Sequence, residues 1–140
     1  MMGDTKKLLE LFNEKAPIAQ LFGMKLSFDD QKNARIHLPY NPNLDHALGL
    51  VHGGIYATML DNAGWFTVAG HNENNNFWIA TTEMSIHFLL PAKQTELVAI
   101  GKIIKLGKRQ SIAEMSLFDG NDNLVGHSTG TFMQLSNVAM

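Results

Sequence analysis

The fold is decided by residues 51–70, VHGGIYATMLDNAGWFTVAG. Apolar side chains cover most of the circumference of a helix over 54–70, so other structure should wrap this helix on most sides. Its apolar positions are Ile55, Met59, Leu60, Ala63, Phe66, Val68 and Ala69. Two features go beyond packing: the glycine pair at the start, and one carboxylate, Asp61, with no Lys or Arg near it in the sequence. An ionised carboxylate in an apolar stretch is costly to bury unless it is paired or used.

The rest of the chain predicts a sheet that covers this helix. In residues 82–90, Met84, Ile86 and Phe88 alternate with polar residues, which is the two-residue period of a half-buried strand. Turn residues separate the later segments closely enough for antiparallel hairpins. The strand-like segments are 24–30, 34–40, 82–90, 96–107, 111–119 and 123–135. One long buried helix packed on one antiparallel sheet is an α+β domain.

The N-terminal residues predict a short amphipathic helix in 5–17, and Pro17 either ends it or begins another turn. No repeat, linker or change of composition divides the chain of 140 residues. We therefore expect a single domain over 1–140, with 1–22 as an N-terminal helical extension.

Composition argues against several classes of protein. The formal net charge is -2 and Lys and Arg form no basic stripe, which argues against a nucleic-acid partner. The absence of cysteine excludes disulfides, thiolate zinc ligands and a thiol nucleophile. The chain shows no signal-peptide pattern, and its one long apolar stretch, 53–70, is interrupted by Asp61 and Asn62. We expect a cytoplasmic protein with no membrane partner.

The glycine pair and the carboxylate each have a chemical and a structural interpretation. A helix that begins at about Gly53 leaves its first N–H groups without partners, and the helix dipole favours a developing oxyanion there. The alternative is a tight turn from loop to helix. Asp61, among apolar neighbours, suits a general base, or else it is a structural carboxylate that bonds to a loop or a partner chain.

Helix geometry restricts how these two residues can act together. Eight residues of α-helix span roughly 12 Å and turn about 80° beyond two full turns. The Gly53 amide and the Asp61 carboxylate of one chain therefore cannot both reach one carbonyl carbon. If both are catalytic, a two-fold dimer must form two composite sites, each taking the amide from one subunit and the carboxylate from the other.

Four features together resemble the hotdog-fold acyl-CoA thioesterases, especially the PaaI-like (phenylacetate-degradation) group. They are a loop that ends in HGG, a carboxylate eight residues after the first glycine, a long central helix, and a strand that ends in LLPAK. The resemblance runs from Phe22 to Gln134. It implies a long helix wrapped by an antiparallel sheet, and dimers, often paired into tetramers, with sites at the subunit interface.

The resemblance also implies roles for individual residues. Asp61 lies where the family has its catalytic Asp or Glu, and Gly53 where a backbone N–H polarises the thioester carbonyl. His46 takes the place usually held by Asn or Gln, which helps to hold the thioester or the water. Thr81 lies where some members have a Ser or Thr that positions the water. Trp65 replaces a Thr one helical turn after the carboxylate, and its bulky ring would shape or narrow the acyl pocket.

The reaction implied is hydrolysis of an acyl-CoA to a free acid and coenzyme A, with Asp61 as general base or as nucleophile. No metal and no cofactor is expected, since coenzyme A is part of the substrate. We place His52 and Gly54 beside the substrate, with His52 shaping the loop. Lys108 and Arg109 either meet the phosphates of coenzyme A or belong to a simple solvated turn.

Two other functions remain open at this stage. The hotdog fold also carries hydratases and dehydratases of acyl thioesters, which usually pair a His with a Glu or Asp; His52 and Asp61 would fill those roles here. The second is a non-catalytic protein that binds acyl-CoA. Fold does not fix function, so the chemistry of the site must decide.

Overall fold

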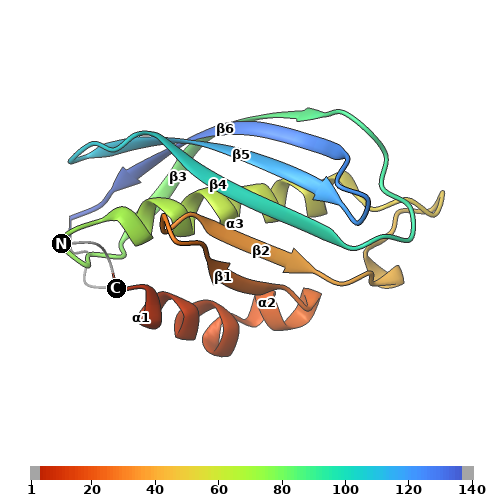
Figure 1. Cartoon of the computed structure of the whole chain (residues 1–140), viewed down its shortest axis with the longest axis horizontal. Helices are drawn as coiled ribbons and strands as arrows, with labels where there is room; N and C mark the ends of the chain where they lie inside the picture. The colour runs from red at the N-terminus through yellow and green to blue at the C-terminus, as the bar shows by residue number, and fades with distance from the viewer. Residues whose placement is uncertain (1–3, 137–140) are drawn as a thin grey trace.

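Helix α3 (Gly53–His71) lies along one face of a six-stranded antiparallel sheet, and the sheet curves around it (Figure 1). The structure is a computed structural model that describes residues 4–136. The helix is buried on most sides, as its apolar circumference predicts, and eleven of its residues are buried. The predicted α+β architecture is therefore confirmed.

The strands do not lie in the sheet in chain order. They are β1 (Lys25–Phe28), β2 (Ala34–Leu38), β3 (Ile79–Phe88), β4 (Leu97–Lys105), β5 (Gln110–Asp119) and β6 (Leu124–Gln134). Their order is β1-β2-β4-β5-β6-β3, so β3 is an edge strand whose only partner in the sheet of residues 4–136 is β6. The hairpins β4–β5 and β5–β6 are those that the turn signals predict, and β1–β2 is the pair of strands predicted over 24–30 and 34–40.

Strand β3 differs from its predicted bounds of 82–90. It begins at Ile79 and ends at Phe88. Leu89 and Leu90 leave the ladder, and both of their N–H groups donate to the carbonyl of Val125 instead. The alternation of apolar and polar residues in this segment identifies the strand but does not fix its ends.

Small residues and one hydroxyl hold α3 close to the sheet. A Cβ at Gly64 would lie 2.6 Å from Cζ of Phe132 and 2.7 Å from Sδ of Met115, so only glycine fits there without movement. Thr67 is completely buried. Its hydroxyl donates to the carbonyl of Ala63 and accepts from the N–H of Ala34, which ties the helix to β2.

The N-terminal residues form α1 (Thr5–Glu10), a π-helical turn (Leu11–Lys15) and α2 (Pro17–Phe22). They pack against α3 rather than standing apart: the buried ring of Phe12 meets the ring of Phe66 edge-on, with centroids 5.1 Å apart. Pro17 opens α2, which is one of the two outcomes predicted for it.

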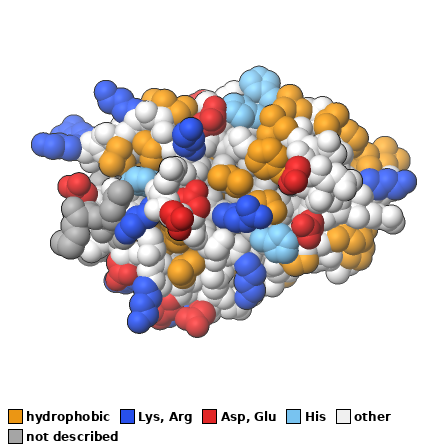
Figure 2. Space-filling model, viewed as in Figure 1, with side chains coloured by type: hydrophobic (Ala, Val, Ile, Leu, Met, Phe, Trp, Pro, Cys, Tyr) orange, Lys and Arg blue, Asp and Glu red, His pale blue; other side chains and the backbone are white. Residues whose placement is uncertain are grey.

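On the face shown in Figure 2, Lys and Arg side chains are scattered among acidic, histidine and hydrophobic side chains and form no basic stripe. Within residues 4–136, no helix is both long enough and apolar enough to cross a membrane.

Candidate active site

The start of α3 is shaped by His52, which is its N-cap. Nδ1 of His52 accepts the N–H of Gly54 at 2.8 Å, so the neutral ring carries its proton on Nε2. A Cβ at Gly54 would lie 2.9 Å from that nitrogen. The sequence predicts that His52 and Gly54 lie beside the substrate. In the structure these two residues are bonded to each other, so the N–H of Gly54 is not free to bind a ligand.

The N–H of Gly53 is different. Among residues 4–136 it has no hydrogen-bond acceptor, although it lies at the positive end of a helix of 19 residues. The ring of Phe88 covers this residue, and a Cβ on Gly53 would lie 3.3 Å from Cε1 of Phe88. A free amide beside an apolar ring is suited to receive an oxyanion.

The segment after β3 is fixed next to this amide by Tyr56, a residue that sequence reasoning missed. Its hydroxyl donates to the carbonyl of Leu90 at 2.7 Å, and its ring packs on Phe88 with centroids 5.7 Å apart. Burial raises the pKa of Tyr56, so the phenol remains protonated and can donate. The spacing of Tyr56 three residues after Gly53, on one side of the helix, is the sequence signal that could have identified it.

His46 lies in the loop that leads to α3. Its N–H donates to the carbonyl of Leu50 at 2.8 Å, and its Nδ1 accepts the N–H of Leu48 at 3.1 Å. The loop therefore holds the ring and places the proton of the neutral form on Nε2. This nitrogen can donate a hydrogen bond, as the Asn or Gln expected at this place would.

Asp61 lies two turns further along α3 and is half-buried. Its Oδ1 accepts the hydroxyl of Thr81, on β3, at 2.7 Å. In the described part of the chain its Oδ2 accepts no hydrogen bond, and no Lys, Arg or His lies within ion-pair distance. A carboxylate held through one oxygen, with the other free and no cation to neutralise it, is suited to take a proton or to attack a carbonyl carbon.

Trp65, one turn after Asp61, is anchored to the same strand. Its indole Nε1 donates to the carbonyl of Ile79 at 2.7 Å, and its ring meets that of Phe66 edge-on with centroids 4.7 Å apart. The polar end of the side chain is therefore satisfied.

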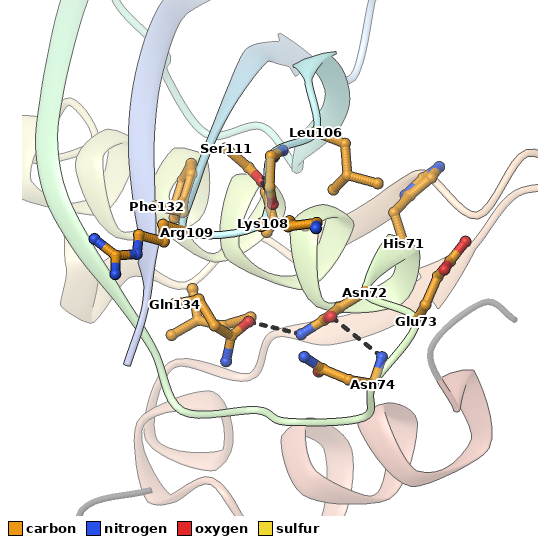
Figure 3. A pocket seen from close by; sticks show the side chains of 13 residues that line it. His71, Asn72, Glu73, Asn74, Leu106, Lys108, Arg109, Ser111, Phe132 and Gln134 are labelled. Carbon is orange, nitrogen blue, oxygen red and sulfur yellow. Dashed lines mark hydrogen bonds between the residues drawn. The ribbon is translucent and has the colours of Figure 1, made fainter. Parts of the chain in front are cut away.

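Lys108 and Arg109 lie at the turn between β4 and β5, beyond the C-terminal end of α3. With His71 they border a cavity of about 540 Å³ whose apolar floor includes Val68 and Phe132. Figure 3 shows Arg109 and His71 on opposite sides of this cavity. His71 is ten residues after Asp61, which is roughly 15 Å along the helix axis.

The predicted residues thus form three groups within one chain. His46, His52, Gly53 and Gly54 surround the start of α3; Asp61, Thr81 and Trp65 lie at its middle; Lys108 and Arg109 lie beyond its end. The first two groups stay apart in one chain, as the helix geometry predicts. Within residues 4–136, no three His, Asp or Glu side chains are arranged to hold a metal ion.

The profile of the Thioesterase superfamily matches residues 48–126, from the loop before α3 into β6. The chain belongs to this superfamily. Its helix wrapped by an antiparallel sheet is the hotdog fold, which confirms the fold that the resemblance implied. The match contains Gly53, Asp61 and Thr81, which lie on the elements that define the fold.

Individual relatives agree with this assignment. The Bacillus halodurans protein BH2602, solved with CoA, is 26% identical, with a TM-score of 0.82 over 96% of this chain and 89% of that one. The Escherichia coli protein PaaI is 17% identical, with a TM-score of 0.77 over 90% of this chain and 89% of that one, which is a likeness of fold. The medium/long-chain acyl-CoA thioesterase YigI of Escherichia coli is 20% identical over 138 residues, covering 89% of each chain.

Proposed function

We propose that this protein hydrolyses acyl-CoA thioesters to the free acid and coenzyme A. The observation that carries the proposal is Asp61: its carboxylate is half-buried, held by Thr81 through one oxygen and neutralised by no cation within residues 4–136. The superfamily, the name of YigI and the CoA bound to BH2602 point to the same substrate class.

The proposed site lies between two copies of the chain, and β3 supports this arrangement. Near its end, Phe88 packs on Gly53; near its start, Thr81 bonds to Asp61. The outer edge of β3 pairs with no other strand in the described part of the chain. Two copies that join these edges antiparallel, about a two-fold axis near Met84, extend the sheet without leaving the edge exposed.

This pairing brings the two halves of the site together. Phe88 of one chain lies opposite Ile79 of the partner subunit, about two strand residues, or roughly 7 Å, from Thr81 of the partner subunit. Gly53, beneath Phe88, then approaches Asp61 of the partner subunit. The dimer therefore supplies what one helix cannot, an amide and a carboxylate at one carbonyl group.

In the proposed mechanism, the thioester carbonyl accepts the free N–H of Gly53, and the helix dipole stabilises the oxyanion that forms. If Asp61 is the general base, it takes a proton from the attacking water; the C–S bond then breaks, and the leaving thiolate of coenzyme A takes up that proton. If Asp61 is the nucleophile, its attack on the carbonyl carbon breaks the C–S bond and gives an anhydride; water then opens the anhydride and supplies the proton that the thiolate takes up. Thr81 orients the carboxylate, and Nε2–H of His46 holds the thioester or the water.

The nucleotide of coenzyme A carries phosphate groups and requires cations. Lys108 and Arg109 border a cavity whose lining also includes Glu73 and the amides of Asn72 and Gln134, which are bonded to each other. We assign the phosphates to this cavity, because Arg recognises them by paired hydrogen bonds and Lys by its point charge.

The hydratase alternative is less well supported by the geometry. It needs the imidazole of His52 beside a carboxylate, but Nδ1 of His52 caps α3 and is engaged by Gly54. The alternative of a non-catalytic acyl-CoA-binding protein can be separated by experiment, because it predicts that acyl-CoA binds without release of a thiol.

The test measures release of free thiol from a panel of acyl-CoAs by the wild type and by Asp61→Asn. We expect turnover to fall roughly 10²- to 10⁴-fold, the usual contribution of a general base, with the dimer intact by size-exclusion chromatography. Equal rates would refute the role of Asp61, and no release of thiol from any substrate would favour the non-catalytic binding protein or the hydratase.

The composite site is tested by mixing two inactive variants. Proline is tolerated at the first position of a helix and lacks the N–H, so Gly53→Pro disables the amide; its Cβ would lie 3.3 Å from Cε1 of Phe88, and the fold of the variant is checked by circular dichroism. Heterodimers of Gly53→Pro with Asp61→Asn contain one intact site and should regain activity. Verified heterodimers without activity would contradict the two-chain site.

A further inference from the structure

The two edges of the sheet differ in how their backbone groups are used. Strand β3 forms one edge and β1 the other. Along β3, from Ala80 to Phe88, no side chain of residues 4–136 bonds to the outer backbone groups, so this edge is open. The edge at β1 is covered, although no further strand of the described chain pairs with it. An open edge is a template for pairing with another chain, and proteins commonly cover an edge that must not pair.

Asn13 covers β1 with its side chain. The N–H of Leu26 donates to Oδ1 of Asn13 at 2.8 Å, and Nδ2 of Asn13 donates to the carbonyl of Leu26 at 3.0 Å. A residue of an adjacent antiparallel strand would exchange the same two bonds. The carboxamide can replace such a residue because it carries both the donor and the acceptor of a peptide group. Asn13 therefore takes the place of a further strand beside β1.

The helical segment 5–22 holds this amide in position. Figure 1 shows its helices α1 and α2 running alongside β1. Asn13 is the middle residue of the π-helical turn of the segment, and such turns frequently mark functional sites. The preceding residue, Phe12, anchors the segment in the core. Just before β1, the N–H of Met24 donates to the carbonyl of Ala19 at 2.9 Å, which closes the edge at that end too.

Neither the proposed reaction nor the superfamily accounts for this contact. The profile of the superfamily matches residues 48–126, which include neither the segment nor β1. The proposed active site uses no residue before His46. Packing of the core explains why Phe12 is buried, but it does not require an amide aligned with both backbone groups of Leu26.

We propose that segment 5–22 is a cover that limits assembly: Asn13 closes the β1 edge, so a second copy of the chain does not extend the sheet there. The consequence for the assembly rests on the two-chain arrangement proposed above. With β1 closed and β3 open, edge-to-edge pairing stops at two chains. With both edges open, each chain has two self-complementary edges, and the copies join into an open linear array.

The size of the assembly is measured by sedimentation velocity for the wild type, Asn13→Ala and Gln20→Ala. Gln20 is the matched control, because its carboxamide lies in the same segment and donates to the carbonyl of Glu14 at 2.8 Å rather than to a strand. We expect the wild type and Gln20→Ala to keep one mass at all concentrations, whereas the mass of Asn13→Ala rises with concentration. An Asn13→Ala mass equal to that of the wild type would overturn the proposal.

General destabilisation is separated by Gly64→Ala, which disturbs the packing of α3 without uncovering β1. This variant should keep the mass of the wild type. The same rise of mass with concentration in Gly64→Ala as in Asn13→Ala would overturn the proposal.

A disulfide test shows where the copies meet, because the chain contains no cysteine of its own. Ser27 is exposed on β1, and Asn121 is exposed at the turn between β5 and β6. Ser27→Cys should form an intermolecular disulfide in the Asn13→Ala background and not in the otherwise wild-type chain, and Asn121→Cys should form none in either. Equally fast crosslinking of Ser27→Cys with Asn13 present, which needs no folded Asn13→Ala, would overturn the proposal, as would equally fast crosslinking of Asn121→Cys.

Amide hydrogen exchange tests the contact itself. At low protein concentration the amide of Leu26 should exchange roughly tenfold faster in Asn13→Ala, the effect expected from the loss of one hydrogen bond. The amide of Ser27, which faces β2 in the antiparallel ladder, should keep its rate. An unchanged rate for Leu26 would overturn the proposal.

The two proposals fail differently. If Asn13→Ala stops at pairs that crosslink through Ser27→Cys, the cover stands and the pairing of β3 edges is wrong. If Asn13→Ala leaves the assembly unchanged while mixed Gly53→Pro and Asp61→Asn chains regain activity, the two-chain site stands and the cover is wrong.

Discussion

Substituting alanine for Gly64 tests how tightly helix α3 is packed on the sheet. The new Cβ would lie 2.6 Å from Cζ of Phe132 and 2.7 Å from Sδ of Met115. Both side chains are completely buried, and they also pack closely on Gly130 of β6, so they have little room to withdraw. Overpacking of this kind costs about 1–3 kcal/mol.

The same substitution stabilises the helix itself. Alanine is more favourable than glycine in a helix interior by about 0.5–1 kcal/mol. With overpacking near 2 kcal/mol and the gain near 1, the net loss is about 1 kcal/mol. For a urea m-value of about 2 kcal/mol/M, the unfolding midpoint falls by about 0.5 M.

Gly70 provides a matched control on the same helix. A Cβ there would meet Cε1 of Phe28 at 3.1 Å, and Phe28 is only partly buried and can shift. Gly70→Ala should therefore leave the midpoint unchanged or raise it, while Gly64→Ala lowers it. Equal shifts in the two variants, or a gain in Gly64→Ala, would refute the packing argument. In a Met115→Ala background, Gly64→Ala should lower the unfolding midpoint by less than it does in the wild type, because Met115 is one of the side chains that the new Cβ would meet.

Two further predictions concern hydrogen bonds to carboxylates. Thr81→Val removes the donor to Asp61, a bond worth about 1.5–3 kcal/mol, so kcat for thiol release should fall roughly 10- to 150-fold; the adjacent Thr82→Val, an exposed control, should retain its rate. The bonds from Asn123 hold the pKa of Asp119 below its ordinary value, and this stabilisation is present above the unfolded pKa of 3.8 and lost as pH falls through the folded one. Asn123→Ala should therefore be less stable than the wild type at pH 7, with the difference closing in acid by urea unfolding, and should raise the pKa of Asp119 measured by NMR.

The parts of the fold that depend on local pattern could be predicted from the sequence. The apolar circumference of α3 and the period of two in the later strands decide element type, and the glycine pair marks the start of the helix. The position of β3 could not be predicted, because hairpin rules favour neighbours in the chain and β3 pairs with β6 across two intervening strands.

One feature of the candidate site follows from spacing alone. Asp61 follows Gly53 by eight positions, which predicts that the two residues lie apart within one chain, as the structure shows. The spacing of Tyr56 after Gly53 marks this residue, but its hydrogen bond to the carbonyl of Leu90 depends on which segments meet in space, so no local pattern contains that contact. His52 also shows this limit, since only the structure reveals that its imidazole is committed to the cap.

The placement of β3 has a consequence for how the chain is made. Phe88 pairs with Gly126, which is 38 residues later, so the edge strand lacks its partner until β6 has been synthesised. At roughly 5–20 residues per second, the ribosome needs about 2–8 s to supply it. During that interval the nascent chain presents a helix that is apolar nearly all round and a strand with two free edges. Translation speed and chaperone access over this interval should therefore govern the soluble yield more than the stability of the finished sheet does.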